Sequence, residues 1–124
     1  MRLIITGYPR TGKTTLGRTL RDEHDWALYS TDDLIPLGWS EASAYAAATW
    51  LTLPGPWIIE GVAAPRMLRK FLAARPDEKP CDEILLQRTP FEVLTPRQAG
   101  MGKGVAKVLE EIKPELLRRG VVFR

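Results

Sequence analysis

The residues with the clearest chemical potential form one eight-residue motif near the N-terminus. It combines two glycines with a lysine and a threonine, in the order Gly7-Tyr8-Pro9-Arg10-Thr11-Gly12-Lys13-Thr14. Glycines let the backbone curl so that several N–H groups point at one anion, and a following helix adds the positive end of its dipole. In such a loop, Lys13 reaches the β- and γ-phosphates of a nucleotide, and the Thr14 hydroxyl ligates Mg²⁺. The motif therefore predicts a P-loop that binds a nucleoside triphosphate.

A P-loop works only between a buried strand and a helix, and the flanking residues predict both. Leu3-Ile4-Ile5-Thr6 is a short apolar, β-branched run that is typical of a strand buried on both faces. From Lys13 to about Glu23, Leu16 and Leu20 lie at i and i+4 among polar residues, as in a helix with one core-facing stripe. We include Thr15 in the binding segment, with a packing or capping role as its alternative. We also expect the side chain of Lys13 to be exposed in the empty loop.

Three acidic residues follow two further predicted strands. Asp32 and Asp33 come after residues 26–29, and Glu60 ends the apolar run 57–60. Open parallel sheets bind their ligands at the carboxyl ends of the strands. Glu60 there can hold the water shell of Mg²⁺ or orient a hydroxyl, and Asp32 can accept a proton from an acceptor. The alternative role for Asp32 is to cap a helix or turn.

Phosphoryl transfer also needs positive charge over the migrating group. Residues 88–102 contain several prolines and glycines, so we predict a surface loop, and a lid over 88–103 that closes on the ligand. Five basic residues lie within reach of the P-loop face or flank this lid: Arg10, Arg66, Arg88, Arg97 and Lys103.

Composition and charge bound the class of protein. The 124 residues are 44% hydrophobic and 27% charged, which fits one globular domain over 1–124. The net charge of +3 is too small to imply nucleic-acid binding by itself. No apolar run approaches the length of a membrane span, and Cys81 is the single cysteine. We therefore expect a cytoplasmic protein that does not bind membranes, and the sequence leaves its oligomeric state open.

Strand and helix signals alternate along the chain. Besides the helix after the P-loop, helical periodicity covers 40–51, with Ser40 as its cap, and the segment after Pro65. It also covers the segment around 105–112, after which Pro114 kinks the helix or opens a second one. Alternation of this kind requires right-handed crossovers and a mostly parallel sheet with helices on both faces. The sequence thus predicts an α/β fold with five strands, at residues 3–6, 26–29, 57–60, 83–86 and 121–123.

On these residues the chain resembles the small P-loop kinases related to adenylate and shikimate kinases. The shared features are the GxxxxGKT loop, acids after the second strand, an apolar strand that ends in Glu60-Gly61, and an arginine-bearing lid. The resemblance implies a three-layer α/β/α fold with strand order 2-3-1-4-5. It also implies ATP and Mg²⁺ as cofactors, with Lys13, Asp32, Asp33, Glu60 and Arg97 as catalytic residues and Thr14 and Glu60 at the metal.

Two departures from the kinase pattern stand beside this resemblance. The lid region lacks a dense arginine series, and the sequence given stops at Arg124, before the loop and helix that usually help to clamp adenine. Residues 37–40 and 55–62 are also similar to short phage and prophage P-loop ATPases.

Two functions follow as alternatives. One is a kinase that transfers the γ-phosphate of ATP to a small acceptor such as a nucleoside, nucleotide or other hydroxyl compound, with the helix that carries Trp39 beside the acceptor. The other is a nucleotide-dependent binding module or slow ATPase that acts with a protein or nucleic-acid partner. A GTPase is disfavoured, because the chain contains no asparagine for an Asn-Lys-x-Asp motif and no DxxG switch.

Overall fold

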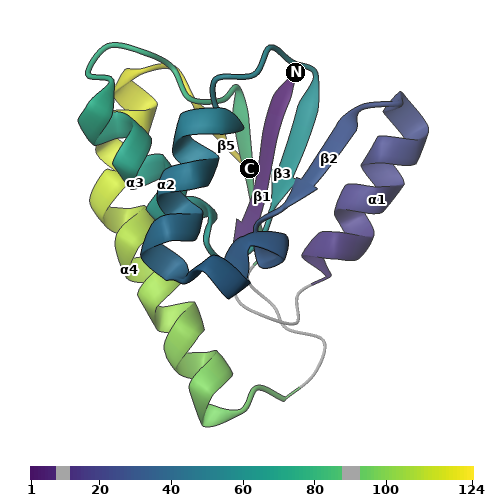
Figure 1. Ribbon diagram of the computed structural model, residues 1–124, viewed down its shortest axis with the longest axis vertical. Helices are drawn as coiled ribbons and strands as arrows, with labels where there is room; N and C mark the ends of the chain where they lie inside the picture. Colours follow the sequence, from purple (N-terminus) through teal and green to yellow (C-terminus); the bar gives the residue numbers. More distant parts are fainter. Residues whose placement is uncertain (8–11, 88–92) are drawn as a thin grey trace.

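The strands form one parallel sheet. The computed structural model describes residues 1–7, 12–87 and 93–124. Within them the sheet has five strands, as the sequence predicted, in the order β2-β3-β1-β4-β5 that the resemblance to small P-loop kinases implied (Figure 1). The strands are β1 (Arg2–Gly7), β2 (Ala27–Ser30), β3 (Trp57–Glu60), β4 (Glu83–Gln87) and β5 (Val122–Phe123).

Helices cover both faces of this sheet, which makes a three-layer α/β/α fold. Figure 1 shows α1 (Lys13–His24) on one side and α2 (Trp39–Thr49), α3 (Ala64–Ala74) and α4 (Pro96–Arg118) on the other. Leu16 and Leu20 of α1 pack with Leu3, Ile5 and Ile58 in a small cluster. The larger core lies on the opposite face, where α2, α3 and α4 meet the sheet.

The middle residues of the central strands β1 and β3 are apolar and buried. Ile4, Ile5, Ile58 and Ile59 are fully buried, as expected for strands with helices on both faces. Cys81 is buried as well, and burial raises the pKa of its thiol to about 12, so it stays protonated and unreactive at neutral pH. No helix among the described residues is long and apolar enough to cross a bilayer.

The predicted loop over 88–102 is wrong in its second half. Residues 88–92 lie outside the described part of the chain, but α4 begins at Pro96 and runs through Pro114 to Arg118 without a second helix. Thr95 caps it, because its hydroxyl accepts from the Gln98 N–H at 3.2 Å and its own N–H donates to Gln98 Oε1 at 3.0 Å. The first turns of α4 project past the carboxyl end of the sheet (Figure 1).

The segment after β2 also differs from expectation. A 3₁₀ helix, η1 (Thr31–Leu37), follows β2 directly. The next helix begins at Trp39 after Gly38, and no side chain caps it, so the predicted cap at Ser40 is wrong. Trp39 therefore lies in the first turn of α2 and not in a loop.

Two glycines bring the strand ends close together at the edge where α1 begins. Gly7 has φ 137°, and a Cβ there would lie 1.9 Å from the Gln87 carbonyl oxygen. Gly61 has φ 140°, and a Cβ there would lie 1.8 Å from Thr31 Oγ1. Neither position has room for a side chain. The carboxyl ends of β1 and β4, and those of β2 and β3, thus meet through glycine.

Candidate functional site

The polar residues that the sequence singled out meet around Glu60. In the sheet, Glu60 pairs with Ile5 of β1 and with Ser30 of β2, so it stands at the carboxyl end of the central strands. The Thr14 hydroxyl, in the first turn of α1, donates to Glu60 Oε1 at 3.1 Å. The P-loop threonine and the acid after β3 are therefore in direct contact, although 46 residues separate them.

Glu60 is ionisable, yet it is only 1% exposed. Burial raises its pKa, and the nearby Asp32 acts in the same direction. Hydrogen bonds from the Ser30 and Thr14 hydroxyls and the charge of Lys13 oppose this shift. A carboxylate held in this way gains from any cation that binds beside it.

Lys13 belongs to the same cluster and is buried, with 8% of its surface exposed, which corrects the expectation of an exposed side chain. Burial lowers the pKa of Lys13, whereas the charges of Glu60 and Asp32 raise it. The charges of two carboxylates thus act on the lysine at the start of α1. Its ammonium is partly desolvated, so it interacts more strongly with an incoming anion than an ammonium in open water would.

Both glycines of the motif, Gly7 and Gly12, have positive φ angles. Gly12 precedes α1 with φ 83°, a conformation that favours glycine, and its carbonyl accepts from the Leu16 N–H at 2.9 Å. Gly12 at the N-cap has no side chain, and no side chain of the described residues caps α1. Uncapped N–H groups at a helix start are suited to bind an anion. The four residues between the glycines, Tyr8, Pro9, Arg10 and Thr11, lie outside the described residues.

Asp32 and Asp33 occupy the first turn of η1, beside the cluster, and both are exposed. Asp32 is close enough to influence the pKa of both Lys13 and Glu60. Its backbone N–H donates to Ser30 Oγ at 3.3 Å, so Ser30 supports both acids. Asp33 shows no such link to the cluster within the described chain.

Other expected residues lie farther from this cluster. Thr15 is exposed, and its carbonyl accepts from the Thr19 hydroxyl at 3.0 Å. Arg97 is exposed in the first turn of α4 and makes no ion pair within the described chain, and Lys103 is exposed on the same helix. Arg88 lies outside the described residues.

Sequence reasoning gave Arg66 only a general role and missed its partner. Its guanidinium lies over the Trp39 ring, 5.0 Å from the centroid, and a Cβ on Gly104 would lie 3.5 Å from its Nη2. Arg66 thus joins the first turns of α2 and α3 to α4, and it makes no ion pair with any described acid. The sequence analysis also did not single out Ser30 and Thr31. The available signal was two small hydroxyl residues directly after the predicted strand 26–29.

The donor set around Glu60 fits a hard divalent cation such as Mg²⁺ and does not favour a softer metal such as Zn²⁺ or Cu²⁺. It offers a carboxylate and a hydroxyl, which are hard oxygen ligands. No group of three His, Cys, Asp or Glu side chains is gathered for a metal in the described chain. Mg²⁺ commonly uses one or two protein oxygens and takes its other ligands from water and phosphates.

Comparison with known proteins supports the fold. No protein-family model matches the chain, and no curated protein matches it. Among solved structures, shikimate kinase from Acinetobacter baumannii in complex with shikimate matches with a TM-score of 0.58 at 14% identity, over 98% of this chain and 81% of that chain. The similarity to phage ATPases remains an expectation. The chain therefore has the α/β fold of a shikimate kinase-like P-loop protein.

Proposed function

We propose that this protein binds Mg-ATP at its P-loop and transfers the γ-phosphate to the hydroxyl group of a small acceptor. The observation that carries the proposal is the contact between Thr14 and Glu60, at 3.1 Å, with Lys13 buried in the same cluster. Two residues of the P-loop motif and an acid from another strand come together where parallel sheets bind ligands. The fold likeness to a kinase supports the same reading.

In this proposal each residue has a separate role. The N–H groups at the start of α1 and the Lys13 ammonium bind the β- and γ-phosphates. The Thr14 hydroxyl and the Glu60 carboxylate hold Mg²⁺, directly or through its water. The metal when bound neutralises the phosphate charge and orients the triphosphate. Ser30 keeps the Glu60 carboxylate in place through its hydrogen bond.

The acceptor binds beside Asp32. The acceptor oxygen forms a bond to the γ-phosphorus, the bond from that phosphorus to the β–γ bridging oxygen breaks, and ADP leaves. The proton of the acceptor hydroxyl passes to the Asp32 carboxylate. In this proposal Asp33, in the same turn of η1, and the Trp39–Arg66 pair, in contact at the starts of α2 and α3, would line the acceptor site, and Arg97 would come to it from the first turn of α4. The shikimate held by the structural neighbour is itself a small hydroxyl compound, which supports this acceptor class.

The test is ATP consumption by the purified chain with Mg²⁺ and a panel of nucleosides, nucleotides, sugars and hydroxy acids. Asp32→Asn serves as the probe and Asp22→Asn, an exposed acid on α1, as the matched control. We expect one acceptor to stimulate ADP release and to gain a phosphate detectable by mass spectrometry. Asp32→Asn should lower that rate about 100-fold, and Asp22→Asn should not change it.

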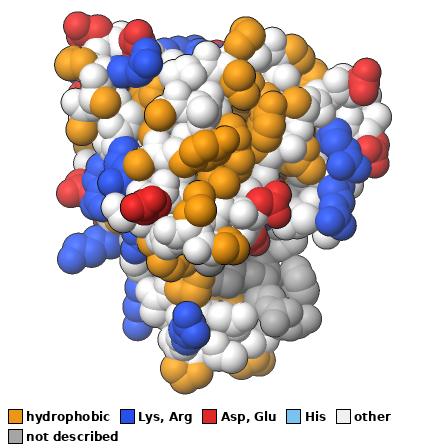
Figure 2. All heavy atoms as spheres, viewed as in Figure 1, with side chains coloured by type: hydrophobic (Ala, Val, Ile, Leu, Met, Phe, Trp, Pro, Cys, Tyr) orange, Lys and Arg blue, Asp and Glu red, His pale blue; other side chains and the backbone are white. Residues whose placement is uncertain are grey.

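The same assay distinguishes the alternative function. A slow ATPase or binding module would bind ATP but show no acceptor-dependent rate, and its hydrolysis would rise with a protein or nucleic acid. On the face shown in Figure 2, Lys and Arg side chains lie in separate groups and form no continuous basic stripe. Intact ATP binding without stimulation by any acceptor would contradict the kinase.

A further inference from the structure

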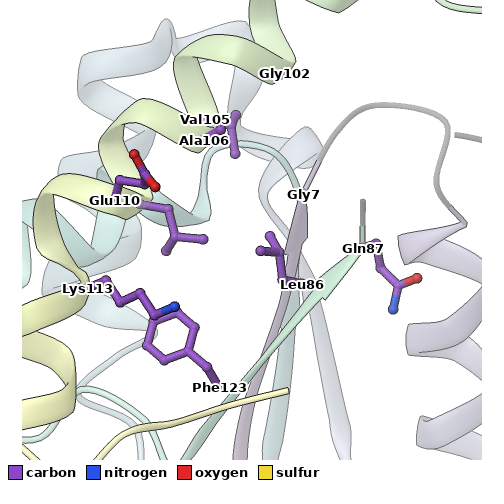
Figure 3. A pocket seen from close by; sticks show the side chains of 10 residues that line it. Gly7, Leu86, Gln87, Gly102, Val105, Ala106, Glu110, Lys113 and Phe123 are labelled. Atoms are coloured by element: carbon purple, nitrogen blue, oxygen red, sulfur yellow. The ribbon is translucent and has the colours of Figure 1, made fainter. Parts of the chain in front are cut away.

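A hollow lies between α4 and the strands β4 and β5, and Lys13, Thr14 and Glu60 are not among the residues that line it. Its volume is about 220 Å³. Its walls are mostly apolar and come from Leu86, Val105, Leu109 and Phe123. Figure 3 shows Leu86 and Phe123 on the sheet side and α4 on the other, while the Gln87 side chain lies to the opposite side of β4. Leu86 and Phe123 are half-buried, and Val105 and Leu109 are buried. An apolar hollow with a few charged groups at its rim is typical of a small-molecule site.

Two opposite charges stand on the α4 wall. Glu110 and Lys113 are three residues apart on α4 and both line the hollow (Figure 3). Neither makes an ion pair with any described residue. Instead, the Lys113 ammonium lies 5.2 Å from the centroid of the Phe123 ring. Side chains at this spacing lie on the same face of a helix, about 5–6 Å apart at Cβ.

A ligand complementary to this hollow would be a small molecule with an apolar body and with one positive and one negative group close together. A carboxylate would meet Lys113, an ammonium would meet Glu110, and the apolar body would cover Leu86 and Phe123. A molecule with only one charge would leave the other rim residue without a partner. We propose that this hollow binds a small zwitterion with a compact apolar body, of the kind that an apolar α-amino acid presents.

Two small residues of α4, Gly102 and Ala106, line the hollow. The hollow also reaches Gly7, the first glycine of the P-loop motif. Its ligand, however, needs no triphosphate and no metal. Binding can therefore be measured in nucleotide-free protein, so failure here and failure of the proposed function are distinguishable.

The test is NMR titration of methyl-labelled protein with three probes that share one ring: L-phenylalanine, 3-phenylpropanoate and phenethylamine. We expect L-phenylalanine to shift the methyl signals of Leu86, Val105 and Leu109 saturably, with a dissociation constant below about 10 mM. The two singly charged probes should bind at least about threefold more weakly, because each forms one fewer ion pair.

Variants link the effect to the hollow. Lys113→Met should remove the advantage of L-phenylalanine over phenethylamine, and Glu110→Gln its advantage over 3-phenylpropanoate. Lys107→Met, an exposed lysine of α4 that does not line the hollow, is the control and should change neither. Ala106→Phe should abolish the shifts by filling the space. The proposal is overturned if no probe shifts these methyls saturably, if all three bind equally, or if Lys113→Met and Lys107→Met behave alike.

Discussion

Gly61→Ala should destabilise the protein strongly, because Gly61, directly after β3, has a positive φ and packs closely against Thr31. Two independent costs add at this position. An L-residue at φ 140° is strained by about 1–2 kcal/mol, and the new Cβ would lie 1.8 Å from Thr31 Oγ1 and 3.0 Å from Thr31 Cβ. Relief of such an overlap costs about 1–3 kcal/mol. We therefore expect a total loss of about 2–5 kcal/mol of unfolding free energy.

A double-mutant cycle separates the two costs. Thr31 is 1% exposed and its Oγ1 has no hydrogen-bond partner in the described structure, so Thr31→Ala alone should cost about 1 kcal/mol or less. Combined with Gly61→Ala, it should recover about 1–2 kcal/mol of the loss, while the backbone strain remains. Gly120→Ala is the matched control: φ is 88° but nothing lies within 4 Å of the new Cβ, so strain alone applies.

The assay is urea denaturation followed by circular dichroism, with unfolding free energies from linear extrapolation. For 124 residues the total stability should be roughly 6–19 kcal/mol, so the single variant still folds and its loss can be measured. The reasoning is refuted if Gly61→Ala costs no more than Gly120→Ala, or if its effect adds to that of Thr31→Ala without coupling.

Further predictions concern the buried charge and the link between helices. Glu60→Gln should lower Mg-dependent turnover about 100-fold or more while the fold is kept; unchanged turnover would make Glu60 a structural residue. Because burial raises the pKa of Glu60 above 4.5, ionisation opposes folding. The unfolding free energy of the wild-type protein should therefore fall relative to that of Glu60→Gln as the pH rises from below 4.5 through the raised pKa. Urea titrations at several pH values measure this difference, and a difference that does not change with pH would contradict the prediction. Arg119→Met should cost about 2–3 kcal/mol in thermal or urea unfolding, because the Arg119 side chain is 5% exposed and donates to the carbonyls of Leu72, Arg75 and Glu78 at 2.5–3.2 Å. Arg118→Met, at a side chain that is 59% exposed, should cost less than about 0.5 kcal/mol. Equal losses of unfolding free energy in the two variants would contradict a stabilising role for the buried hydrogen bonds of Arg119.

The positions of the central strands could be predicted because local sequence and burial agree there, whereas the strand order was implied by the resemblance to small P-loop kinases. Trp57, Ile58 and Ile59 are apolar and buried in β3 as expected, and Glu60 at its end is buried as well. The stripe of Met67, Leu68, Phe71 and Leu72 likewise marks the buried face of α3. In such segments hydrophobic periodicity decides the structure, and distant contacts add little new information.

The start of α4 could not be predicted from propensity. Gly100, Gly102 and Gly104 each disfavour a helix by roughly 1 kcal/mol relative to alanine, so the segment resembled a loop. Tertiary contacts outweigh this cost: Gly102 is buried and Gly104 adjoins Arg66. One local signal was present and was missed, namely the capping box that begins at Thr95.

The site was predicted in its residue types and only partly in its geometry. The spacing of the motif placed Lys13 and Thr14 at a helix start, and the strand pattern placed Glu60 at the same edge. Nothing local in the sequence indicates that Lys13 is buried, because Glu60 and Asp32, whose charges act on it, come from other parts of the chain. The contact between Arg66 and Trp39 likewise depends on how α3 packs on α2.

The most direct test of the central claim is the dissociation constant of Mg-ATP, measured by isothermal titration calorimetry for wild-type protein, Lys13→Met and Arg18→Met. Methionine keeps the apolar stem of the buried lysine, and Arg18 is an exposed cation on the same helix. We predict that Lys13→Met weakens binding about 100-fold, as expected when a charge-assisted contact to phosphate is lost, while Arg18→Met binds within about twofold of wild type. Equal affinity in the wild-type and Lys13→Met proteins, with both folded, would contradict a P-loop that holds the triphosphate.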